Sequence, residues 1–426
     1  MVVRSYTGHL CIVFRIITHI AHKKRLKLKK LNKKCWLSPD ITNIQLYARK
    51  RVRMRIFMSR LFTDLLPHYE GRIHSIAFFW TPHKKLVYKY LIPVTMRCMN
   101  TLQERAAKNV SDIVRHAIKH DDERHALVVF DTRSALARTV TDAYRSALPH
   151  ATFIDFDAST SEAIVALIAN LHPRDLVVMV QSSNFRLSEF RIRIELFQRS
   201  LAVIEHVHLE RITDETQMAT YIDALAYDPS FYSDVAKSLK EKIDRAETIV
   251  VRCAGTALTY EGGMEPTKLN IGDYTGMKNV GGTFPIGEVF SEPRDFSRVN
   301  GEAMLFAFAG IDHCAKMYTP FKIKIERGIL VSHEGPEEFQ AVLDQIATEE
   351  AVLVREFGVG LNSAMGKNRI VSDITAFERQ KGLHLSLGEK HGVYKKPGFI
   401  PKKTHYHIDV FVDVSHIEID GETLQY

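Results

Sequence analysis

Cysteine is scarce in this chain. Of 426 residues, five are cysteine, and no two of them form a Cys-x-x-Cys pair. An odd number of widely spaced cysteines argues against a disulfide framework and against a structural zinc site built on such pairs. This usage is typical of the reducing cytoplasm, and we expect Cys253 and Cys314 to be small buried side chains.

Long uncharged apolar runs are also lacking. The apolar run from His9 to Ala21 contains Arg15 and is too short to span a bilayer. It lacks a small-residue cleavage site, so the sequence predicts neither a transmembrane segment nor a secretory signal. No Gly-x-Gly-x-x-Gly motif follows the first strand predicted after residue 99, which leaves a dinucleotide site without support.

Acidic residues are almost absent from residues 1–98, which hold 21 Lys and Arg against 3 Asp and Glu. The net charge of +8 therefore belongs to this segment, and the rest of the chain is acidic. Basic clusters at 22–30 and 49–55 could attract nucleic acid or an anionic membrane without specificity. The alternative is a basic extension that is disordered or not native, because the charge balance reverses and a helical pattern begins at Met99. We favour the alternative and expect no specific nucleic-acid partner.

Residues 99–245 alternate between helical patterns and short apolar strands. The predicted strands are 126–131, 152–156, 175–180 and 202–209, and the predicted helices are 102–120, 134–148, 161–171, 186–199 and a pair within 216–245 broken at Asp228-Pro229. This alternation predicts an α/β domain with a mostly parallel sheet covered by helices. We expect this domain to support the structure and to shape the substrate site.

Residues 246–426 are richer in glycine and β-branched residues. The predicted strands include 246–252, 303–308, 321–327 and 351–355, with one helix at 336–347 and a closing hairpin at Asp420-Gly421. The fold class predicted for the whole chain is therefore α/β: a parallel-sheet α/β domain followed by a mixed α+β domain.

The segment Thr404–Val412 alternates polar and apolar residues, which predicts a strand. Side chains alternate in a strand, so His405, His407 and Asp409 share one face and Ile408 lies on the other. An edge strand with its polar face in water would explain this pattern. A metal site is the other explanation, since imidazole and carboxylate together suit Zn, Mn, Co or Fe.

Two further stretches favour the metal site. His384 lies in a short apolar run between Gly382 and Gly388, and Glu288 follows a Pro-x-Gly turn and precedes a Val-Phe pair. Each has an ordinary structural alternative, because Glu288 could cap the turn and His384 could be a core histidine.

Taken in order, these segments resemble the aminopeptidase T family of dinuclear metallo-aminopeptidases. The matching segments are Pro285–Phe290, Arg355–Gly358 with Glu356, His384–Gly388 and His407–Asp409. An upstream segment, Gly255–Thr259, is similar to the family's Gly-Thr-Asp-Leu-Thr, with Ala257 in place of the acid. The resemblance covers roughly residues 253–426 well and the preceding domain weakly.

The resemblance implies a metal-dependent aminopeptidase that acts on peptides as a homodimer, with residues 246–426 as its metal-binding catalytic domain. It implies two divalent ions, Zn, Co or Mn, held by Glu288, Glu356, His384, His407 and Asp409. Such a pair of ions can bind the amine and carbonyl of a substrate and generate a hydroxide. We expect His405 to lie behind the ligands or in solvent.

One position departs from the family. The family has a catalytic Tyr seven residues after the metal-binding His, and here that position is His391, with Tyr394 the nearest tyrosine. Tyr394 takes that role, or His391 donates to the oxyanion, or peptidase activity is lost. Glu356 is the third residue to which we assign a catalytic role.

The alternative function is a mononuclear Fe(II) ring-cleaving dioxygenase that resembles 2,5-dihydroxypyridine 5,6-dioxygenase. It needs two His and one carboxylate, here His384, His407 and Asp409. Glu288 and Glu356 would then have no role as ligands, so this function ranks second. A protein that binds nucleic acid through its basic extension ranks third, because the body of the chain is acidic and the extension has few interleaved aromatics.

Overall fold

The computed structural model describes residues 101–187, 192–388, Tyr394 and 406–425 with their side chains, and four strands of the first hundred residues by their backbone. The chain divides into two compact units, residues 1–100 and 101–426. Each unit is described separately below.

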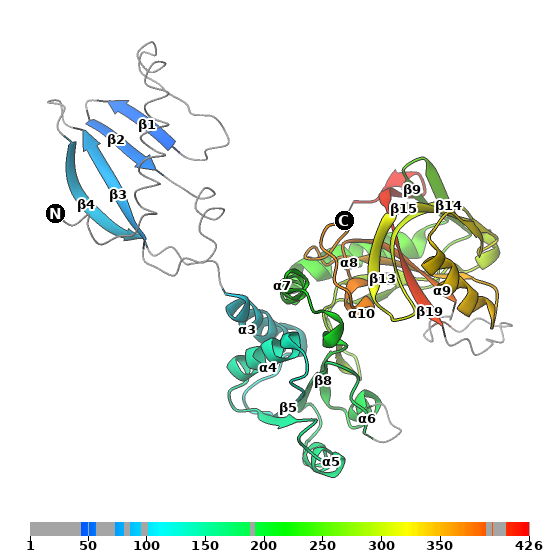
Figure 1. The fold of residues 1–426 in the computed structure, drawn as a ribbon, viewed down its shortest axis with the longest axis horizontal. Coiled ribbons are helices and arrows are strands. Elements are labelled where there is room, and N and C mark those ends of the chain that lie inside the picture. The colour runs from blue at the N-terminus through cyan, green and yellow to red at the C-terminus, as the bar shows by residue number, and fades with distance from the viewer. Residues whose placement is uncertain are drawn as a thin grey trace. The chain divides into compact units, whose positions relative to one another are not determined.

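The first unit contains an antiparallel sheet with strand order β1-β2-β3-β4 (Figure 1). Its strands are β1 (Ile44–Arg49), β2 (Arg51–Ile56), β3 (Ile73–Trp80) and β4 (Leu86–Val94). The run from His9 to Ala21 and the basic cluster at 22–30 lie outside the described residues. That residues 1–98 are a basic extension outside the native protein stays a prediction.

The second unit begins with a five-stranded parallel sheet of order β12-β8-β7-β5-β6. Its strands are β5 (Ala126–Phe130), β6 (Thr152–Asp155), β7 (Leu176–Val180), β8 (Ala202–His206) and β12 (Val280–Thr283). The first four are the strands predicted from the sequence. The fifth, β12, comes from beyond residue 246, so the later part of the chain completes the earlier sheet.

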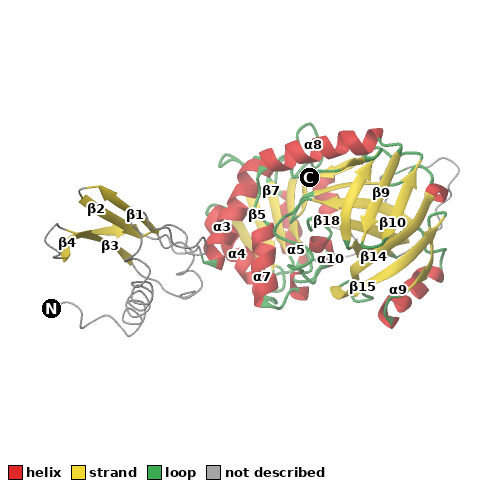
Figure 2. Cartoon of the chain, turned by 90° about the horizontal axis from the view of Figure 1, so that it is seen from above, coloured by secondary structure: helices red, strands yellow, loops and turns green. Residues whose placement is uncertain are grey.

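Helices cover both faces of the parallel sheet (Figure 2). They are α3 (Leu102–Asp112), continued by a π-helical segment (Ile113–Ile118), α4 (Ala135–Ala147), α5 (Ser161–Ala169), α6 (Ile192–Gln198) and α7 (Glu215–Ala224). Val128 and Val178 pack in the core that contains α3, α4 and α7, whereas Val129 and Val177 pack with α5 and α6. Burial on both faces explains why the strands are continuously apolar rather than alternating.

The rest of the second unit is built on a twelve-stranded antiparallel sheet, strongly curled, with α9 (Glu337–Ala347) packed beside it (Figures 1 and 2). The strand order is β11-β13-β17-β18-β19-β14-β10-β9-β20-β21; in addition, β15 pairs with β14, and β16 pairs with β15. The bounds are β9 (Thr248–Cys253), β10 (Thr256–Glu261), β11 (Lys268–Asn270), β13 (Glu288–Ser291), β14 (Val299–Ala309), β15 (Ala315–Glu326), β16 (Ile329–His333), β17 (Val354–Gly360), β18 (Gly382–Gly388), β19 (His407–Val412), β20 (Val414–Ile419) and β21 (Glu422–Thr423).

Two further helices border the curled sheet. Helix α8 (Pro229–Arg245) begins at an Asp228 cap with proline in its first turn and contacts β11 and β13. The short helix α10 (Ile374–Phe377) begins at Asp373, whose carboxylate accepts a hydrogen bond from the Ala376 backbone at 3.0 Å. Helix α10 therefore leads directly into Arg379 and the start of β18.

The predicted fold class is confirmed, since a parallel α/β sheet is followed by a mixed, mainly antiparallel part. The closing hairpin is also present, because β20 pairs with β21 around Asp420-Gly421. The domain boundary predicted at residue 245 stays a prediction. Among the helices of the described residues, none combines the length and the apolarity that crossing a bilayer requires.

Candidate metal centre

Four neighbouring strands of the curled sheet carry the predicted metal ligands. Strands β13, β17, β18 and β19 lie next to one another in that order. In their ladders Glu288 is opposite Gly360, and His384 is opposite both Gly358 and Phe411. Directly opposed residues share a face of a sheet, so Glu288 and His384 project from the same face.

The last of these strands adds two more side chains to that face. Asp409 lies opposite Ser386 and His407 lies opposite Gly388, so both share the face of His384. The alternation predicted for this segment is therefore confirmed from His407 onward. We call the group formed by Glu288, His384, His407 and Asp409 on this face, together with Glu356 of β17, the carboxylate wall.

Three donor atoms meet at the centre of the wall. Nε2 of His384 lies 3.2 Å from Oε1 of Glu288 and 3.3 Å from Oε1 of Glu356. All three residues are buried, and their donor atoms lie within 4.8 Å of one another. Two donors bonded to one ion at about 2.1 Å stand about 3.4 Å apart in tetrahedral geometry. The Glu288–Glu356–His384 cluster can therefore hold a metal ion.

Glu356 reaches this position through an irregularity in β17. The ladder between β17 and β18 shifts register between Val354 and Phe357, and the backbone N–H of Glu356 donates to Oγ of Ser386 at 3.0 Å. Ser386 is fully buried and follows His384 by two residues on the same strand. Ser386 is not among the predicted site residues, although the two-residue period of the strand places it on this face.

Gly358 leaves room for the ring of His384. A Cβ atom at residue 358 would lie 2.1 Å from Cε1 and 2.2 Å from Nε2 of that ring. The ring therefore lies directly over Gly358 of β17. Phe411 packs beside it, with the two ring centroids 6.1 Å apart. Nδ1 of His384 is buried and makes no hydrogen bond with any described residue. Nε2 is thus the nitrogen that faces the carboxylates.

The solvent exposure of the histidine side chains in the wall increases from His384 to His407. Nε2 of His407 lies 3.2 Å from Oδ1 of Asp409. Asp409 is buried, whereas the His407 side chain is 34% exposed. Within the part of the chain that the structure describes, the His407 side of the wall is therefore more exposed than the side of His384.

The charges of the wall stabilise one another. Burial alone would lower the pKa of His384, but the carboxylates of Glu288 and Glu356 raise that pKa to about 10. Burial would raise the pKa of the Glu288 carboxyl, but Arg379 and His384 lower it overall. The pKa of Asp409 is also lowered, because His407 outweighs the effect of burial. The carboxyls of Glu288 and Asp409 are therefore held in the charged form that binding of a metal ion requires.

The predicted catalytic residues are only partly described. Tyr394 is buried, and its hydroxyl donates to the backbone carbonyl of Phe290 at 3.2 Å. Phe290 follows Glu288 by two residues on β13, so the tyrosine lies against the wall. Burial raises the pKa of the Tyr394 hydroxyl. His391 and His405 lie outside the described residues.

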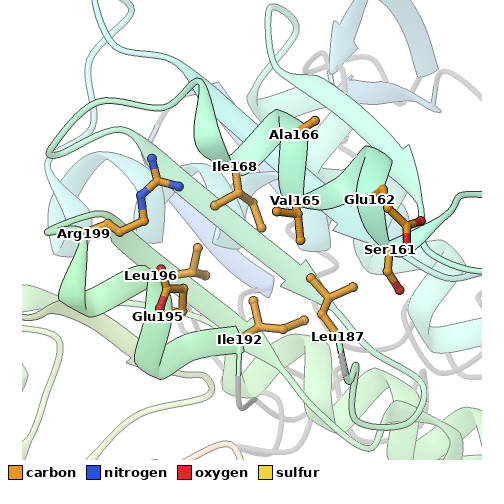
Figure 3. Close-up of a pocket in the computed structure, with 10 residues that line it drawn as sticks. All are labelled: Ser161, Glu162, Val165, Ala166, Ile168, Leu187, Ile192, Glu195, Leu196 and Arg199. Carbon is orange, nitrogen blue, oxygen red and sulfur yellow. The ribbon is translucent and has the colours of Figure 1, made fainter. Parts of the chain in front are cut away.

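A separate groove of about 800 Å³ opens between α5 and α6 on the parallel-sheet part (Figure 3). Its sides are mainly apolar, with Val165, Ile168, Ile192 and Leu196 among them and Arg199 at one end. None of the predicted site residues lines it. The groove is therefore separate from the carboxylate wall.

Comparison with known proteins gives no match to any family model and none to a curated protein. The match between this chain and the aminopeptidase T family stays a resemblance of motifs.

Solved structures provide a relationship of fold. The structure of 2,5-dihydroxypyridine dioxygenase from Pseudomonas putida KT2440 superposes with a TM-score of 0.52 at 14% identity, over 76% of this chain and 95% of that chain. Wild-type AmpT from Thermus thermophilus gives a TM-score of 0.48 at 13% identity, over 76% and 96%. The chain shares its fold with the dioxygenase at a distance. Identity this low leaves the reaction open.

Proposed function

We propose that this chain is a metallo-aminopeptidase that removes N-terminal residues from peptides. Two divalent ions, Zn, Co or Mn, would be held by Glu288, Glu356, His384, His407 and Asp409. The observation that supports this most is the meeting of two buried carboxylates at one imidazole nitrogen, at 3.2 and 3.3 Å. The Asp409–His407 pair continues the same face of the sheet.

The number and kind of donors favour two ions over one. Three carboxylates and two imidazoles exceed the four positions of a tetrahedral zinc site. A dinuclear site uses such a set through shared carboxylates, with its ions about 3.5–4 Å apart. Oxygen-rich donors with imidazole suit Zn, Mn and Co.

The residues of the wall and its neighbours would have different roles in hydrolysis. Bound ions would polarise the peptide carbonyl and provide a hydroxide at neutral pH. Glu356 lies beside His384 at the centre of the cluster, where a carboxylate can accept a proton from the attacking water. Tyr394 or His391 would donate to the oxyanion. Asp409 would orient His407 at the more exposed end, where the free amine of the substrate enters.

The iron dioxygenase is the rival function. It would use His384, His407 and Asp409 and would leave Glu288 and Glu356 as buried carboxylates without a ligand role. The likeness to the dioxygenase structure concerns the fold.

The test starts from protein depleted of metal with a chelator and reloaded with Zn²⁺, Co²⁺, Mn²⁺ or Fe²⁺. We expect release of the N-terminal residue from tripeptides with a free amine, and none from the same tripeptides after N-acetylation. Failure to cleave any free-amine peptide with any metal would contradict the proposal. Ring opening of 2,5-dihydroxypyridine by the Fe²⁺ form in air would then establish the rival.

Matched variants connect that activity to the wall. Glu356→Gln removes one charge at the centre and should abolish cleavage. Glu326→Gln makes the same change at an exposed residue of β15 and should leave cleavage unchanged. A cytoplasmic location and a homodimer remain expectations from the sequence.

A further inference from the structure

Arg379 is a buried cation beside one of the proposed ligands. It is 7% exposed, and its Nε lies 3.7 Å from Oε2 of Glu288. The other oxygen of that carboxylate, Oε1, lies 3.2 Å from Nε2 of His384. The two oxygens of Glu288 therefore face different side chains, and only Oε1 faces the centre of the wall.

Side chains and a carbonyl hold the guanidinium in place. Asn270 lies directly opposite Glu288 in the β11–β13 ladder, and its amide oxygen accepts from Nε and Nη2 of Arg379 at 3.3 and 2.8 Å. Nη1 donates to the Thr375 carbonyl at 3.1 Å and is paired with the Glu378 carboxylate. Each of the three guanidinium nitrogens of Arg379 therefore has a partner.

The backbone of Arg379 is held as well. Gly360 lies opposite Glu288 on the other side, and a Cβ there would lie 2.8 Å from the carbonyl carbon of Arg379. The Asn362 N–H donates to the Arg379 carbonyl oxygen at 3.0 Å. Moving Arg379 away from Glu288 would require this packing to break.

The contact between Arg379 and Glu288 acts through charge. At 3.7 Å it is longer than a hydrogen bond, and a guanidinium keeps its proton throughout the working pH range. A divalent ion bound at Oε1 would lie within a few ångströms of this fixed positive charge and would be repelled by it. In bulk water such a repulsion is worth about tenfold in affinity at that range, and the Glu378 carboxylate paired with Arg379 offsets part of it.

We propose that Arg379 is a positioning residue that competes with a metal ion for Glu288 and makes the two metal positions unequal. This inference rests on the proposed dinuclear function. The ion at Glu288 binds more weakly than its partner and exchanges with solution, while Oε2 stays engaged with Arg379. Arg379 thereby prevents Glu288 from chelating the ion with both oxygens.

The test is calorimetric titration of the metal-depleted chain with Zn²⁺. The wild-type chain should show two steps of unequal affinity, and Glu288→Gln should lose the weaker step. Arg379→Met, which removes the charge, should tighten the weaker step by about tenfold, while Arg379→Lys, which keeps the charge, should not. Turnover should fall in Arg379→Met although the metal binds more tightly, a combination that a purely structural role would not produce.

Other outcomes separate this inference from the proposed function. Unchanged or weaker binding in Arg379→Met, or two equal steps in the wild type, would overturn the role of Arg379 while leaving the metal site intact. Absence of any Zn²⁺ binding by the folded wild type would overturn the proposed function itself. Arg379→Gln, which places an amide N–H near the position of Nε beside Asn270, replaces the Met variant if that variant does not fold. Arg252→Met breaks an Arg–Glu pair with Glu418, away from the wall, and should leave both steps unchanged.

Discussion

Gly358 lies directly opposite His384 in the β17–β18 ladder, and the imidazole occupies the space that a side chain at residue 358 would need. Gly358→Ala should therefore displace the ring from Glu288 and Glu356, because a Cβ atom would lie 2.1 Å from Cε1. We expect metal affinity to fall at least about 100-fold, as judged from losses on disturbing metal surroundings. Zn²⁺ titration measures this loss.

Gly366→Ala is the matched control for this substitution. The nearest atoms to a Cβ there are 3.9 and 4.0 Å away, so alanine fits without displacing anything. Equal metal affinity in Gly358→Ala and Gly366→Ala would show that the position of the His384 ring does not matter for binding.

Local periodicity accounts for much of what the sequence predicted about the site. A two-residue period places His407 and Asp409 on one face of β19 whatever the tertiary structure, and the same rule would have selected Ser386 two residues after His384. The four strands of the parallel sheet were predictable for a similar reason, because continuous apolar runs between helices indicate buried parallel strands.

The features that the sequence did not predict depend on contacts between segments that are far apart in the chain. Nothing in the segment around Val280–Thr283 indicates that β12 leaves its neighbours to pair with β8. Arg379 gives no local signal either, since Asn270 and Gly360 place it beside Glu288 from segments far away in the chain. Such pairings depend on the assembled sheet.

The His407–Asp409 pair should behave as one unit. His407→Ala and Asp409→Ala should each abolish activity, and the double variant should be no worse than either, because losing one partner already disrupts the site. The measurement is kcat/KM for the three variants under equal metal loading. Additive losses would mean that the two residues act independently.

Ile408 provides the contrast on the same strand. It is buried opposite Leu387 on the other face. Ile408→Ala should lower the free energy of unfolding by about 2–5 kcal/mol, while the folded fraction keeps its metal. An emptied metal site in Ile408→Ala, with His407→Ala and Asp409→Ala still active, would mean that the strand faces the other way.

His206 should make the second unit sensitive to acid. Burial lowers its pKa to about 3, and its ring lies between the hydroxyls of Tyr144 at 2.9 Å and Tyr221 at 3.0 Å. The Tyr221 hydroxyl donates to the Phe284 carbonyl, so it accepts from Nδ1–H of His206, and Nε2 accepts from Tyr144. The neutral ring is therefore fully bonded.

The unfolded chain protonates His206 near pH 6.5, whereas the folded chain does so only near pH 3. Stability from this group is therefore complete above about pH 6.5 and is lost as the pH falls toward 3, by up to about 1.4 kcal/mol per pH unit. Denaturant titrations between pH 6 and 4 should show a shallower loss in His206→Gln than in the wild type. His172→Gln, at an imidazole that is 80% exposed, should leave the slope unchanged. Equal slopes in wild type and His206→Gln would contradict this account.

A chain that starts at Met99 should fold and keep its metal. Residues 101–426 form a compact unit of their own, and such a chain retains Thr101, whose hydroxyl and backbone N–H form a capping box with Glu104 at the start of α3. Circular dichroism, thermal melting and Zn²⁺ titration of the shortened chain check this. Insolubility or loss of metal would show that residues 1–98 belong to the core.

The central claim is that the carboxylate wall holds two divalent ions. Elemental analysis of the full chain, purified without added metal and expressed as metal per chain, measures this most directly. The account predicts close to two equivalents of Zn, Mn or Co in the wild type and about one in Glu288→Gln. One equivalent of iron with no second metal, or no metal in protein that is folded, would contradict it.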